Sequence, residues 1–418
     1  MSELTANRRS RRTSSVGKIE LGDIAVPGIE ASRSRSDTIK HTQQQIESLN
    51  KVSKDISDYD VLSKLITSIS ILCYKYIWIV PLSIILSLNL IYLLSNNYTE
   101  TNPLHKFLRL SYQIPNTNPP LYEKGWNDFA FVAQMMIFFT FLREFMMQVI
   151  LKPMARYLGI KGKSKIARFN EQTYAIFYYG ITSPLGLYIM KQTPMWFFNT
   201  KEFYVNYPHL QHTWLFKFYY LFQAGFWSQQ ALVLLLRLEK PRKDFKELVF
   251  HHIVTILLVS LSYMFNYTWM GLAIYITMDV SDLFLGTSKT LNYLNHPLEM
   301  PFFIIFIFVW IYCRHYLNLK ILWSVLTEYM TVGPTILDFK NQQYKCWISQ
   351  PMVFTLIFAL QLVNLYWLFL ILRIMVRFLL YNVKKDERSD SESESDTELE
   401  VEKNQNQNEI EDKLKKEI

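Results

Sequence analysis

The sequence predicts an all-α polytopic membrane protein with about eight transmembrane helices, six or seven of which form a bundle that encloses a lipid cavity. Half of the 418 residues are apolar and 16% are aromatic. The apolar residues gather in runs, such as 302–311 and 352–360, that are too continuous for the amphipathic helices of a soluble protein. Eight such stretches approach the ~20 residues that a helix needs to cross a bilayer. Long apolar runs joined by polar loops therefore indicate a helical membrane bundle.

The expected elements follow a simple order along the chain. Residues 1–60 are rich in Ser, Arg and Gln without periodicity, so we expect a disordered N-terminal arm. We expect the first span itself to direct insertion, without a cleavable signal peptide. Residues 165–383 are expected to form the principal bundle, with a central hairpin at 248–290, and the acidic segment 384–418 a disordered tail. The predicted spans lie at 76–94, 127–150, 172–190, 214–236, 249–267, 270–289, 301–323 and 352–378.

Charge in the short loops predicts the orientation in the membrane. Segment 151–170 carries six Lys or Arg residues and no Asp or Glu, and segment 237–247 carries five Lys or Arg residues. Both segments follow even-numbered spans, so the positive-inside rule places them, with both termini, in the cytosol. The sequon at Asn97 then falls on the luminal side, which makes Asn97 a glycosylation candidate. The net charge of +8 thus reflects topology and gives no indication of nucleic-acid binding.

Both terminal arms carry candidate phosphorylation sites. Ser14 follows a cluster of arginines, as substrates of basic-directed kinases do, although the cluster is equally consistent with a solvated basic arm that supports the topology. Ser389, Ser391 and Ser393 are each followed three positions later by an acidic residue, which suits an acid-directed kinase. The alternative is a disordered acidic tail that keeps the protein soluble.

The C-terminal residues indicate a location. Lys415 and Lys416 occupy the fourth and third positions from the end of the chain. Lysines at these positions form the dilysine retrieval signal of endoplasmic reticulum membrane proteins when the tail is cytosolic. The loop charges independently place the tail there. We therefore expect a multi-pass protein of the endoplasmic reticulum membrane.

Two adjacent histidines and two aspartates lie in the central hairpin. His251 and His252 belong to one apolar span, and Asp279 and Asp282 belong to the next. Each ionisable side chain at membrane depth costs about 2.5–3.5 kcal/mol on insertion scales, so such residues usually have a task. The short turn near 266–271 makes the spans antiparallel, and a rise of ~1.5 Å per residue puts His252 level with Asp282. We expect the four side chains to meet in one pocket that opens toward the cytosol.

These residue types suit acyl transfer. Imidazole titrates near neutrality and can act as a general base, a general acid or a nucleophile that forms an acyl-imidazole. A neighbouring carboxylate orients the imidazole, and carboxylates also attract a cationic amine. Because the group lies within a membrane bundle, the pattern predicts acyl transfer to an amine carried by a lipid.

The polar residues of the hairpin could instead have a structural role or bind a metal. In transporters and sensors, buried histidines and aspartates satisfy one another inside the bundle, and they could do so here. Metal binding fits the sequence less well, because membrane di-iron enzymes use several histidine boxes, whereas this chain has eight histidines and one adjacent pair. The three cysteines are far apart and offer neither a zinc motif nor a disulfide framework. We therefore predict no metal site.

Two adjacent pairs of charged or titratable side chains inside predicted spans also need an explanation. Arg143 and Glu144 are neighbours, so we expect a structural ion pair. Arg314 and His315 either contact the phosphates of a donor substrate or snorkel toward the membrane interface.

The span 214–236 carries three glutamines near a tryptophan. Gln223, Gln229 and Gln230 lie on faces next to Trp227, where hydrogen bonds between helices are their expected role. Trp227 and Gln230 are nevertheless candidates for substrate binding, because they lie in the span that precedes the hairpin.

Several segments resemble the ceramide synthases, members of the TLC-domain family. The signature-like part comprises Phe-His-His-Ile-Val-Thr at 250–255, Tyr-Ile-Thr-Met-Asp-Val-Ser-Asp at 275–282 and Ser-Lys-Thr-Leu-Asn-Tyr at 288–293. The likeness covers most of 70–380. No homeobox-like insert separates the first two predicted spans, and in this respect the chain is similar to the fungal, longevity-assurance type. Further resembling segments are 196–201, 238–244 and 318–326.

The resemblance implies an enzyme that transfers a fatty acyl group from acyl-CoA to the amine of a sphingoid base, giving (dihydro)ceramide and CoA. In that family the paired histidines and two aspartates carry the reaction, which assigns it to His251, His252, Asp279 and Asp282 here. Either a histidine deprotonates the amine or a histidine first accepts the acyl group, while the aspartates position the imidazole and the ammonium. Acyl-CoA is a substrate, so no separate cofactor is expected.

The same hypothesis names further contacts. The fungal enzymes resembled use very-long-chain acyl-CoA and a small single-span regulatory subunit, and either a homodimer or a heterodimer with a paralogue fits the resemblance. Coenzyme A is expected to rest on basic cytosolic loops through Lys163, Lys165, Arg242 and Lys243, whose charges can meet its phosphates. The remaining substrate-binding candidates are Trp227, Gln230, Arg314 and His315. The alternative is a non-catalytic TLC-type lipid sensor or membrane-insertion accessory, since a fold alone does not guarantee catalysis.

Overall fold

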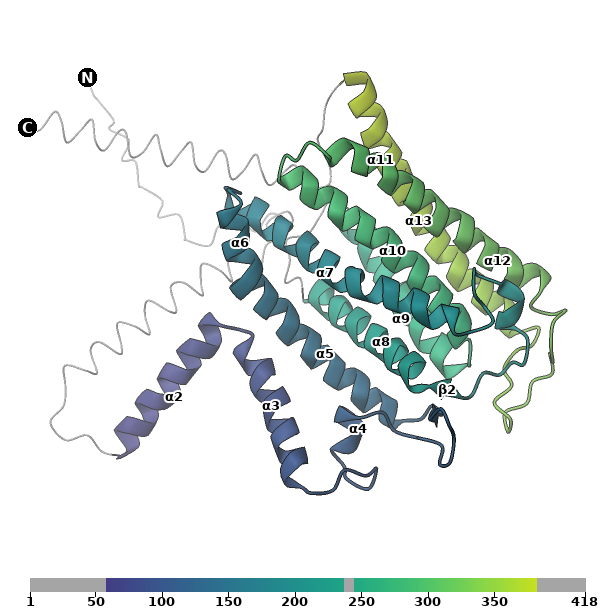
Figure 1. Cartoon of the computed structure of the whole chain (residues 1–418), viewed down its shortest axis with the longest axis horizontal. Coiled ribbons are helices and arrows are strands. Elements are labelled where there is room, and N and C mark those ends of the chain that lie inside the picture. The colour runs from purple at the N-terminus through teal and green to yellow at the C-terminus, as the bar shows by residue number, and fades with distance from the viewer. Residues whose placement is uncertain (1–57, 237–243, 382–418) are drawn as a thin grey trace, which may run out of the picture.

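The computed structural model describes residues 58–236 and 244–381, and these residues form helices joined by connections of varied length (Figure 1). One two-stranded antiparallel sheet pairs β1 (Leu121–Tyr122) with β2 (His212–Thr213). The helices in chain order are α2 (Asp58–Lys75), α3 (Ile79–Leu94), α4 (His105–Leu108), α5 (Asn127–Phe145), η2 (Met146–Leu151), α6 (Lys152–Tyr157), α7 (Lys163–Lys191), η3 (Thr200–Phe203), α8 (Trp214–Leu235), α9 (Phe245–Met264), α10 (Thr268–Tyr293), α11 (Glu299–Trp310), η4 (Ile311–Leu317), α12 (Asn318–Thr327) and α13 (Ser349–Tyr381).

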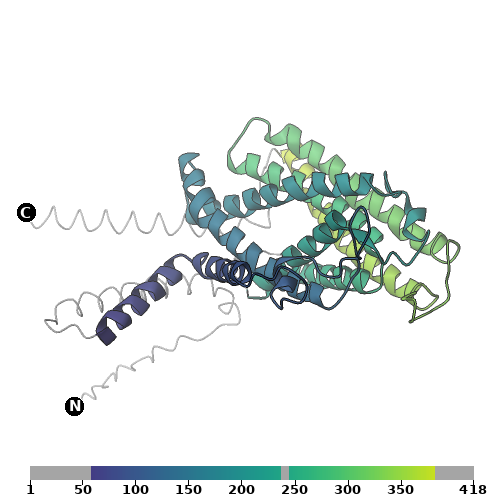
Figure 2. The same cartoon turned by 60° about the horizontal axis from the view of Figure 1, so that its bottom comes forward.

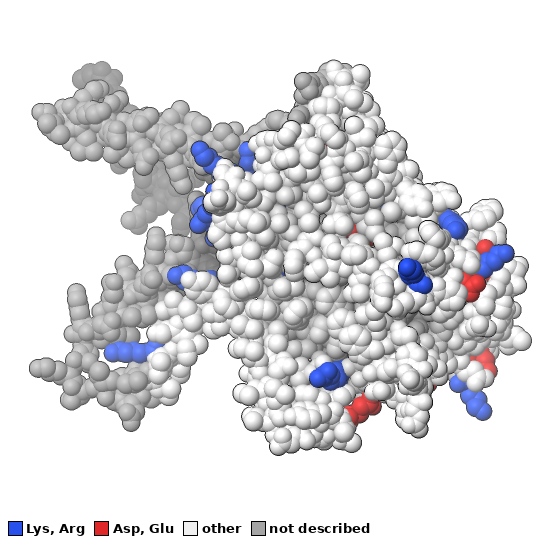
Figure 3. All heavy atoms as spheres, viewed as in Figure 1, with Lys and Arg blue, Asp and Glu red and all other residues white. Residues whose placement is uncertain are grey.

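The long helices confirm the predicted fold class of an all-α, multi-pass membrane protein. Helices α7 and α8 match the predicted spans 172–190 and 214–236 and cross the same bundle, although they carry more polar residues (Figure 1). On the face shown in Figure 3, charged side chains gather at opposite sides and leave a broad uncharged surface between them. Among the described residues, five helical segments are long and apolar enough to cross a membrane: Asn127–Tyr157, Phe245–Met264, Thr268–Tyr293, Glu299–Thr327 and Ser349–Leu380.

The bundle has two chemically different ends, which we name by their residues. At the basic end, α7 begins and α10 ends, and Phe169 packs with Tyr293 there. This end carries the exposed side chains of Lys163 and Lys165. At the aromatic end, α9 turns into α10 and α13 begins. The ring of Tyr267 stacks on those of Tyr207 and Tyr329 at this end.

Helix α10 is the centre of the bundle. It packs along α7 and also contacts α9, α11 and η4, while α5 and α13 cover α8 and α9 from outside. In the most apolar 18-residue stretch of α10, 56% of the residues are buried, compared with 17% in the corresponding stretch of α9. Gly286 permits the close approach of α7, because a Cβ at this position would lie 3.1 Å from the side chain of Ile176. Polar side chains on α10 are therefore held inside the protein and away from lipid.

Two local features were not expected from the sequence. Helix α2 precedes the first predicted span and projects away from the main bundle in both views (Figures 1 and 2). Its apolar residues, among them Leu62, Ile66 and Ile69, recur every three or four positions and are exposed, as in helices that lie along a membrane surface. The predicted arm 1–60 lies outside the described residues except for 58–60, which begin α2.

The seventh predicted span, 301–323, is one continuous helical segment with a π-helical insertion. The insertion is η4 (Ile311–Leu317), between α11 and α12. Such insertions occur often at functional sites because they change the direction in which side chains project. Here the insertion contains Arg314, which is directed toward α10.

Candidate active site

Two cavities meet inside the bundle between α8, α9 and α13. The first, which we call the polar chamber, has a volume of about 260 Å³ and is lined by His251, His252 and Asp282, among others. The second, which we call the apolar chamber, has a volume of about 240 Å³ and extends toward the aromatic end. His251 and Trp227 line both cavities, so the two chambers are neighbours there, and we call the space beside these two residues the junction.

The adjacent histidines face different surroundings, as expected for neighbours on a helix, whose side chains diverge by about 100°. Their ring centroids are 5.7 Å apart and the ring planes are nearly perpendicular, at 89°. The ring of Trp227 lies 6.0 Å from each imidazole, and that of Trp367 lies 5.0 Å from His251. His251 is buried, whereas His252 is half-buried. The two rings therefore present separate nitrogens to the cavities.

A backbone carbonyl sets the tautomer of His252. Its Nδ1 lies 2.9 Å from the carbonyl oxygen of Leu248, one turn earlier in α9. A carbonyl oxygen can only accept a hydrogen bond, so Nδ1 carries a hydrogen, and in the neutral imidazole Nε2 then has the lone pair. We expected a carboxylate in this orienting role, and the Leu248 carbonyl performs it here. The arrangement makes Nε2 of His252 a proton acceptor or nucleophile.

His251 is positioned by packing rather than by strong hydrogen bonds. Its Nε2 lies 3.5 Å from the hydroxyl oxygen of Thr255, at the limit for a hydrogen bond. Its buried Nδ1 has no hydrogen-bond partner among the described residues. A polar ring atom that is buried in this way usually pairs with a ligand or a water molecule.

Asp282 is held by a buried arginine. The Nη2 atom of Arg314 donates a hydrogen bond to Oδ1 of Asp282 at 2.5 Å, and the arginine side chain is only 2% exposed. The same guanidinium donates to Ser281 at 2.6 Å and to Asn364 at 3.1 Å. It also lies over the ring of Trp310. Of the two expectations for Arg314, snorkelling is wrong, because the side chain is buried and ion-paired within the bundle.

Asp279 occupies a different environment from Asp282. It is fully buried and lines neither chamber. Its Oδ2 accepts a hydrogen bond from the side chain of Gln223 and lies 3.5 Å from the hydroxyl of Tyr219. Gln223 in turn accepts a hydrogen bond from Tyr178 at 2.7 Å. The structure thus brings His251, His252 and Asp282 to one chamber, whereas Asp279 joins α7, α8 and α10 behind its wall.

The other predicted substrate contacts divide into two groups. Trp227 and Gln230 line the polar chamber. His315 lines neither chamber, and its Nδ1 lies 2.8 Å from the side-chain nitrogen of Gln361. Gln223 forms the interhelical hydrogen bonds that we expected of the glutamines.

Two of the four predicted coenzyme A contacts are described, and both lie outside the chamber lining. Lys163 and Lys165 are exposed in the first turn of α7. Arg242 and Lys243 fall outside the described residues, as do the candidate modification and retrieval residues Ser14, Ser389, Ser391, Ser393, Lys415 and Lys416. Asn97 is described, and its Oδ1 accepts a hydrogen bond from the Thr99 hydroxyl at 2.7 Å.

Three cationic residues that line the polar chamber were not among the predicted substrate contacts. Arg143, Arg168 and Lys289 line it, from α5, α7 and α10. Arg143 also forms the expected ion pair with Glu144, at 2.6 Å. Lys289 follows Asp282 by seven residues, or two helical turns, so both lie on one face of α10. That spacing was the signal available in the sequence.

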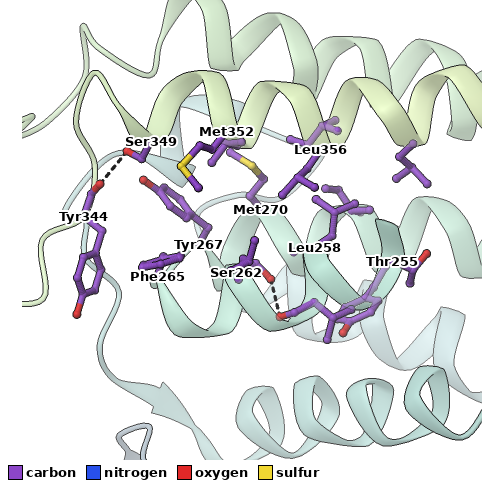
Figure 4. A pocket seen from close by; sticks show the side chains of 18 of the residues that line it. Thr255, Leu258, Ser262, Phe265, Tyr267, Met270, Tyr344, Ser349, Met352 and Leu356 are labelled. Carbon is purple, nitrogen blue, oxygen red and sulfur yellow. Dashed lines mark hydrogen bonds between the residues drawn. The ribbon is translucent and has the colours of Figure 1, made fainter. Parts of the chain in front are cut away.

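The apolar chamber is long and is lined at one end by a loop (Figure 4). Its walls come from α9, α10 and α13, for example Leu258, Met270 and Leu356. From His251 to Phe265 the wall of α9 extends about 20 Å at ~1.5 Å per residue. The loop before α13 contributes Leu337, Phe339, Tyr344, Cys346 and Ile348 at the aromatic end. The chamber therefore has the length and lining for a hydrocarbon chain.

A buried lysine fastens this loop. The ammonium of Lys345 donates to the backbone carbonyls of Tyr329 and Val332, at 2.8 and 2.5 Å. Burial lowers the pKa of Lys345 to about 8.

The described residues contain no group of three or more His, Cys, Asp or Glu side chains arranged to hold a metal ion.

The fold and the site together define a multi-pass helical membrane protein with a histidine–carboxylate site between a charged chamber and a lipid-sized one. The TLC domain family model matches residues 168–373. Ceramide synthase LAG1 of Saccharomyces cerevisiae is 53% identical over 389 residues, 93% of each chain. The chain therefore belongs to the TLC-domain family that contains the ceramide synthases.

Two further relatives are similar over much of their length. Sphingosine N-acyltransferase lac1 of Schizosaccharomyces pombe is 47% identical over 366 residues, which cover 87% of this chain and 91% of the relative. Sphingosine N-acyltransferase-like protein FUM17 of Gibberella moniliformis is 45% identical over 324 residues, 76% of this chain and 83% of the relative. These names confirm the resemblance to ceramide synthases and favour it over the lipid-sensor alternative.

Proposed function

We propose that this protein transfers a fatty acyl group from acyl-CoA to the primary amine of a sphingoid base, with CoA and a (dihydro)ceramide as products. The observation that carries the proposal is that His251 lines both a charged chamber and an apolar chamber. A thioester whose hydrocarbon chain fills the apolar chamber has its carbonyl carbon at this junction, beside both imidazoles. The names of relatives that are 45–53% identical support the same activity.

The reaction requires a group that moves a proton. A carbon–nitrogen bond forms as the carbon–sulfur bond of the thioester breaks, and the proton that leaves the nitrogen ends on the sulfur of CoA. Nε2 of His252 has the lone pair to accept this proton, because Nδ1 donates to Leu248. Asp282 lines the same chamber and attracts the ammonium form of the amine, which releases one proton to solvent to become the neutral nucleophile.

Two routes fit this arrangement. In the first, an imidazole removes the proton while the amine attacks the thioester directly. In the second, an imidazole attacks first, forming an acyl-imidazole that the amine then cleaves. The position of His251 at the junction suits the second route, with His252 as the base. Incubation of the protein with acyl-CoA alone, followed by measurement of its intact mass, separates the two routes. An acyl adduct that forms on the wild type and is absent from His251→Ala would exclude simple base catalysis.

The test of the activity is turnover of acyl-CoA and sphinganine by the purified protein. We expect His252→Ala and Asp282→Asn to lose at least about 100-fold in kcat/KM, the range for removal of a general base. His296→Ala is the matched control, because His296 is exposed and lines neither chamber. Unchanged turnover in both variants would remove the proposed mechanism. Absence of turnover in folded wild-type protein would favour a lipid sensor or a missing subunit.

We further propose that the basic end of the bundle and both termini are cytosolic, in the endoplasmic reticulum membrane. The positive charge of segment 151–170 and the lysines Lys415 and Lys416 support this location. Soluble acyl-CoA would then enter the polar chamber directly from the cytosol. A single-span regulatory subunit and a dimer remain proposals that rest on the family. A glycan on Asn97, detected as a glycosidase-sensitive mass shift lost in Asn97→Gln, would place that loop in the lumen.

A further inference from the structure

We propose that α2 (Asp58–Lys75) is an in-plane membrane anchor. Its apolar face enters the surface of the bilayer that the chain itself spans, at the basic end of the bundle. Its binding depends on how loosely the lipids are packed and not on their charge. The partner of this surface is therefore the lipid bilayer, and the inference is independent of the acyl transfer proposed above.

The position of α2 along the membrane normal follows from its connection to the bundle. Only residues 76–78 separate the end of α2 from the start of α3. The ring of Trp78 lies 5.4 Å from that of Phe145, the last residue of α5. Beyond it, α6 packs on α7 at the basic end through Ala155 and Phe169. Since Tyr76 and Trp78 are residue types that gather at membrane interfaces, α2 begins its course at the level of the lipid headgroups.

The apolar face of α2 fits the surface of a bilayer better than its interior. The apolar part, Leu62–Cys73, is about 18 Å long at ~1.5 Å per residue, well short of the ~30 Å hydrocarbon core. No other described helix packs along α2, which projects away from the bundle (Figures 1 and 2). Five large apolar side chains on one face are each about half exposed: Leu62, Leu65, Ile66, Ile69 and Leu72. The nearest apolar medium that can cover this face is the bilayer entered by α3.

The polar face of α2 carries hydroxyl groups and little charge. Two aspartates and two lysines give the helix a formal charge of zero. The hydroxyl-bearing residues are Ser63, Thr67, Ser68 and Ser70. In-plane helices that recognise anionic lipids have polar faces rich in Lys and Arg, and α2 lacks that feature. Its binding must then come from insertion of the apolar side chains, which requires gaps between the headgroups and is sensitive to lipid packing.

The first experiment measures which face of α2 meets lipid in the full-length protein, reconstituted in nanodiscs. Cys313 and Cys346 are buried, so Cys73→Ser leaves a background in which a new surface cysteine can be labelled with a fluorophore. Ile69→Cys and Thr67→Cys form a matched pair, because residues two positions apart diverge by about 200° around a helix. We expect a nitroxide on the lipid chains to quench the label at Ile69 at least about threefold more than the label at Thr67, and aqueous iodide to do the reverse.

The second experiment varies the lipids around the label at Ile69. Replacing part of the phosphatidylcholine with phosphatidylserine should change the quenching by lipid less than about twofold. Replacing unsaturated lipids with saturated ones and sterol, which close the gaps between headgroups, should reduce it at least about threefold. Ile66→Ser should weaken insertion in all lipids. Ser68→Lys with Ser70→Lys should add the dependence on phosphatidylserine that the wild type lacks.

Three results would overturn the proposal. Equal quenching of both labels by lipid would mean that α2 is immersed in the bilayer and not in its surface. Protection of the Ile69 label from both quenchers would mean that protein covers the apolar face, either another copy of the chain or a different partner. Insertion that requires phosphatidylserine in the wild type would show that charge, and not lipid packing, controls the anchor.

Discussion

The polar and apolar chambers have nearly the same volume, about 260 and 240 Å³, yet they are built by opposite means. In the polar chamber a few ionic contacts, above all that of Arg314 with Asp282, fix the side chains in place. In the apolar chamber side chains of four helices and one loop form the lining, mainly by apolar packing and without ion pairs among the described lining residues. Ionic contacts depend on each partner, whereas apolar packing tolerates changes that conserve volume. The two chambers should therefore respond very differently to substitution.

The largest effect is expected from Arg314→Met. Removing one partner of a buried ion pair typically costs about 3–5 kcal/mol, because the other charge is left uncompensated. Asp282 would lose its partner, so we expect a lower melting temperature and a loss of at least about 100-fold in kcat/KM. Thermal unfolding in detergent and acyl-CoA turnover measure the two quantities.

A double variant separates stability from chemistry in the polar chamber. Arg314→Met combined with Asp282→Leu removes both charges, and we expect it to regain much of the lost stability, as apolar replacements of buried ion pairs often do. Activity should stay low, because no carboxylate remains to attract the amine. Full activity in the double variant would show that the ion pair serves folding alone.

Much of the polar chamber could be predicted from the sequence, because it depends on helix geometry. The helical rise and the short turn were enough to bring His251, His252 and Asp282 together. The partner of Asp282 could not be predicted, since Arg314 reaches it across a helix interface and through the π-helical insertion η4. Asp279 and Asp282 differ by about 60° around the axis of α10, which was enough to direct Asp279 toward α7 and α8.

The apolar chamber was much less predictable. The sequence indicated a lipid cavity but not its walls, because continuous apolar helices show no periodicity that separates lipid-facing from cavity-facing residues. The loop that lines its far end, with Phe339 and Tyr344, has no helix or strand and is held by Lys345. Helix α2 was missed for a related reason, since its apolar positions recur every three or four residues instead of forming a run.

A smaller effect is expected from Asp279→Asn. The amide retains an acceptor oxygen for Gln223 and nearly the same shape, and the residue lines neither chamber. We expect a loss of about tenfold or less in kcat/KM, well below that of Asp282→Asn, because only the support of the wall changes. Asp279→Leu should lower the melting temperature more, since the buried side-chain nitrogen of Gln223 loses its carboxylate acceptor and keeps only the hydroxyl of Tyr219. Equal losses from Asp279→Asn and Asp282→Asn would show that both carboxylates act on substrate.

The smallest effect on overall turnover, but the most selective one, is expected from Ile274→Trp. Ile274 lies in the wall of the apolar chamber beyond the junction, so a larger ring shortens the space for a hydrocarbon chain without touching His251. Turnover of a short acyl-CoA should stay near wild type. The ratio of kcat/KM for a very long to a short acyl-CoA should fall about tenfold, in line with the 1–3 kcal/mol by which apolar pockets discriminate small differences in size. Leu365→Trp is the control, because Leu365 is exposed on α13 and lines neither chamber. An unchanged ratio, with both variants folded, would mean that the chain follows another path from the junction, and the contrast between the two chambers would then lose its functional basis.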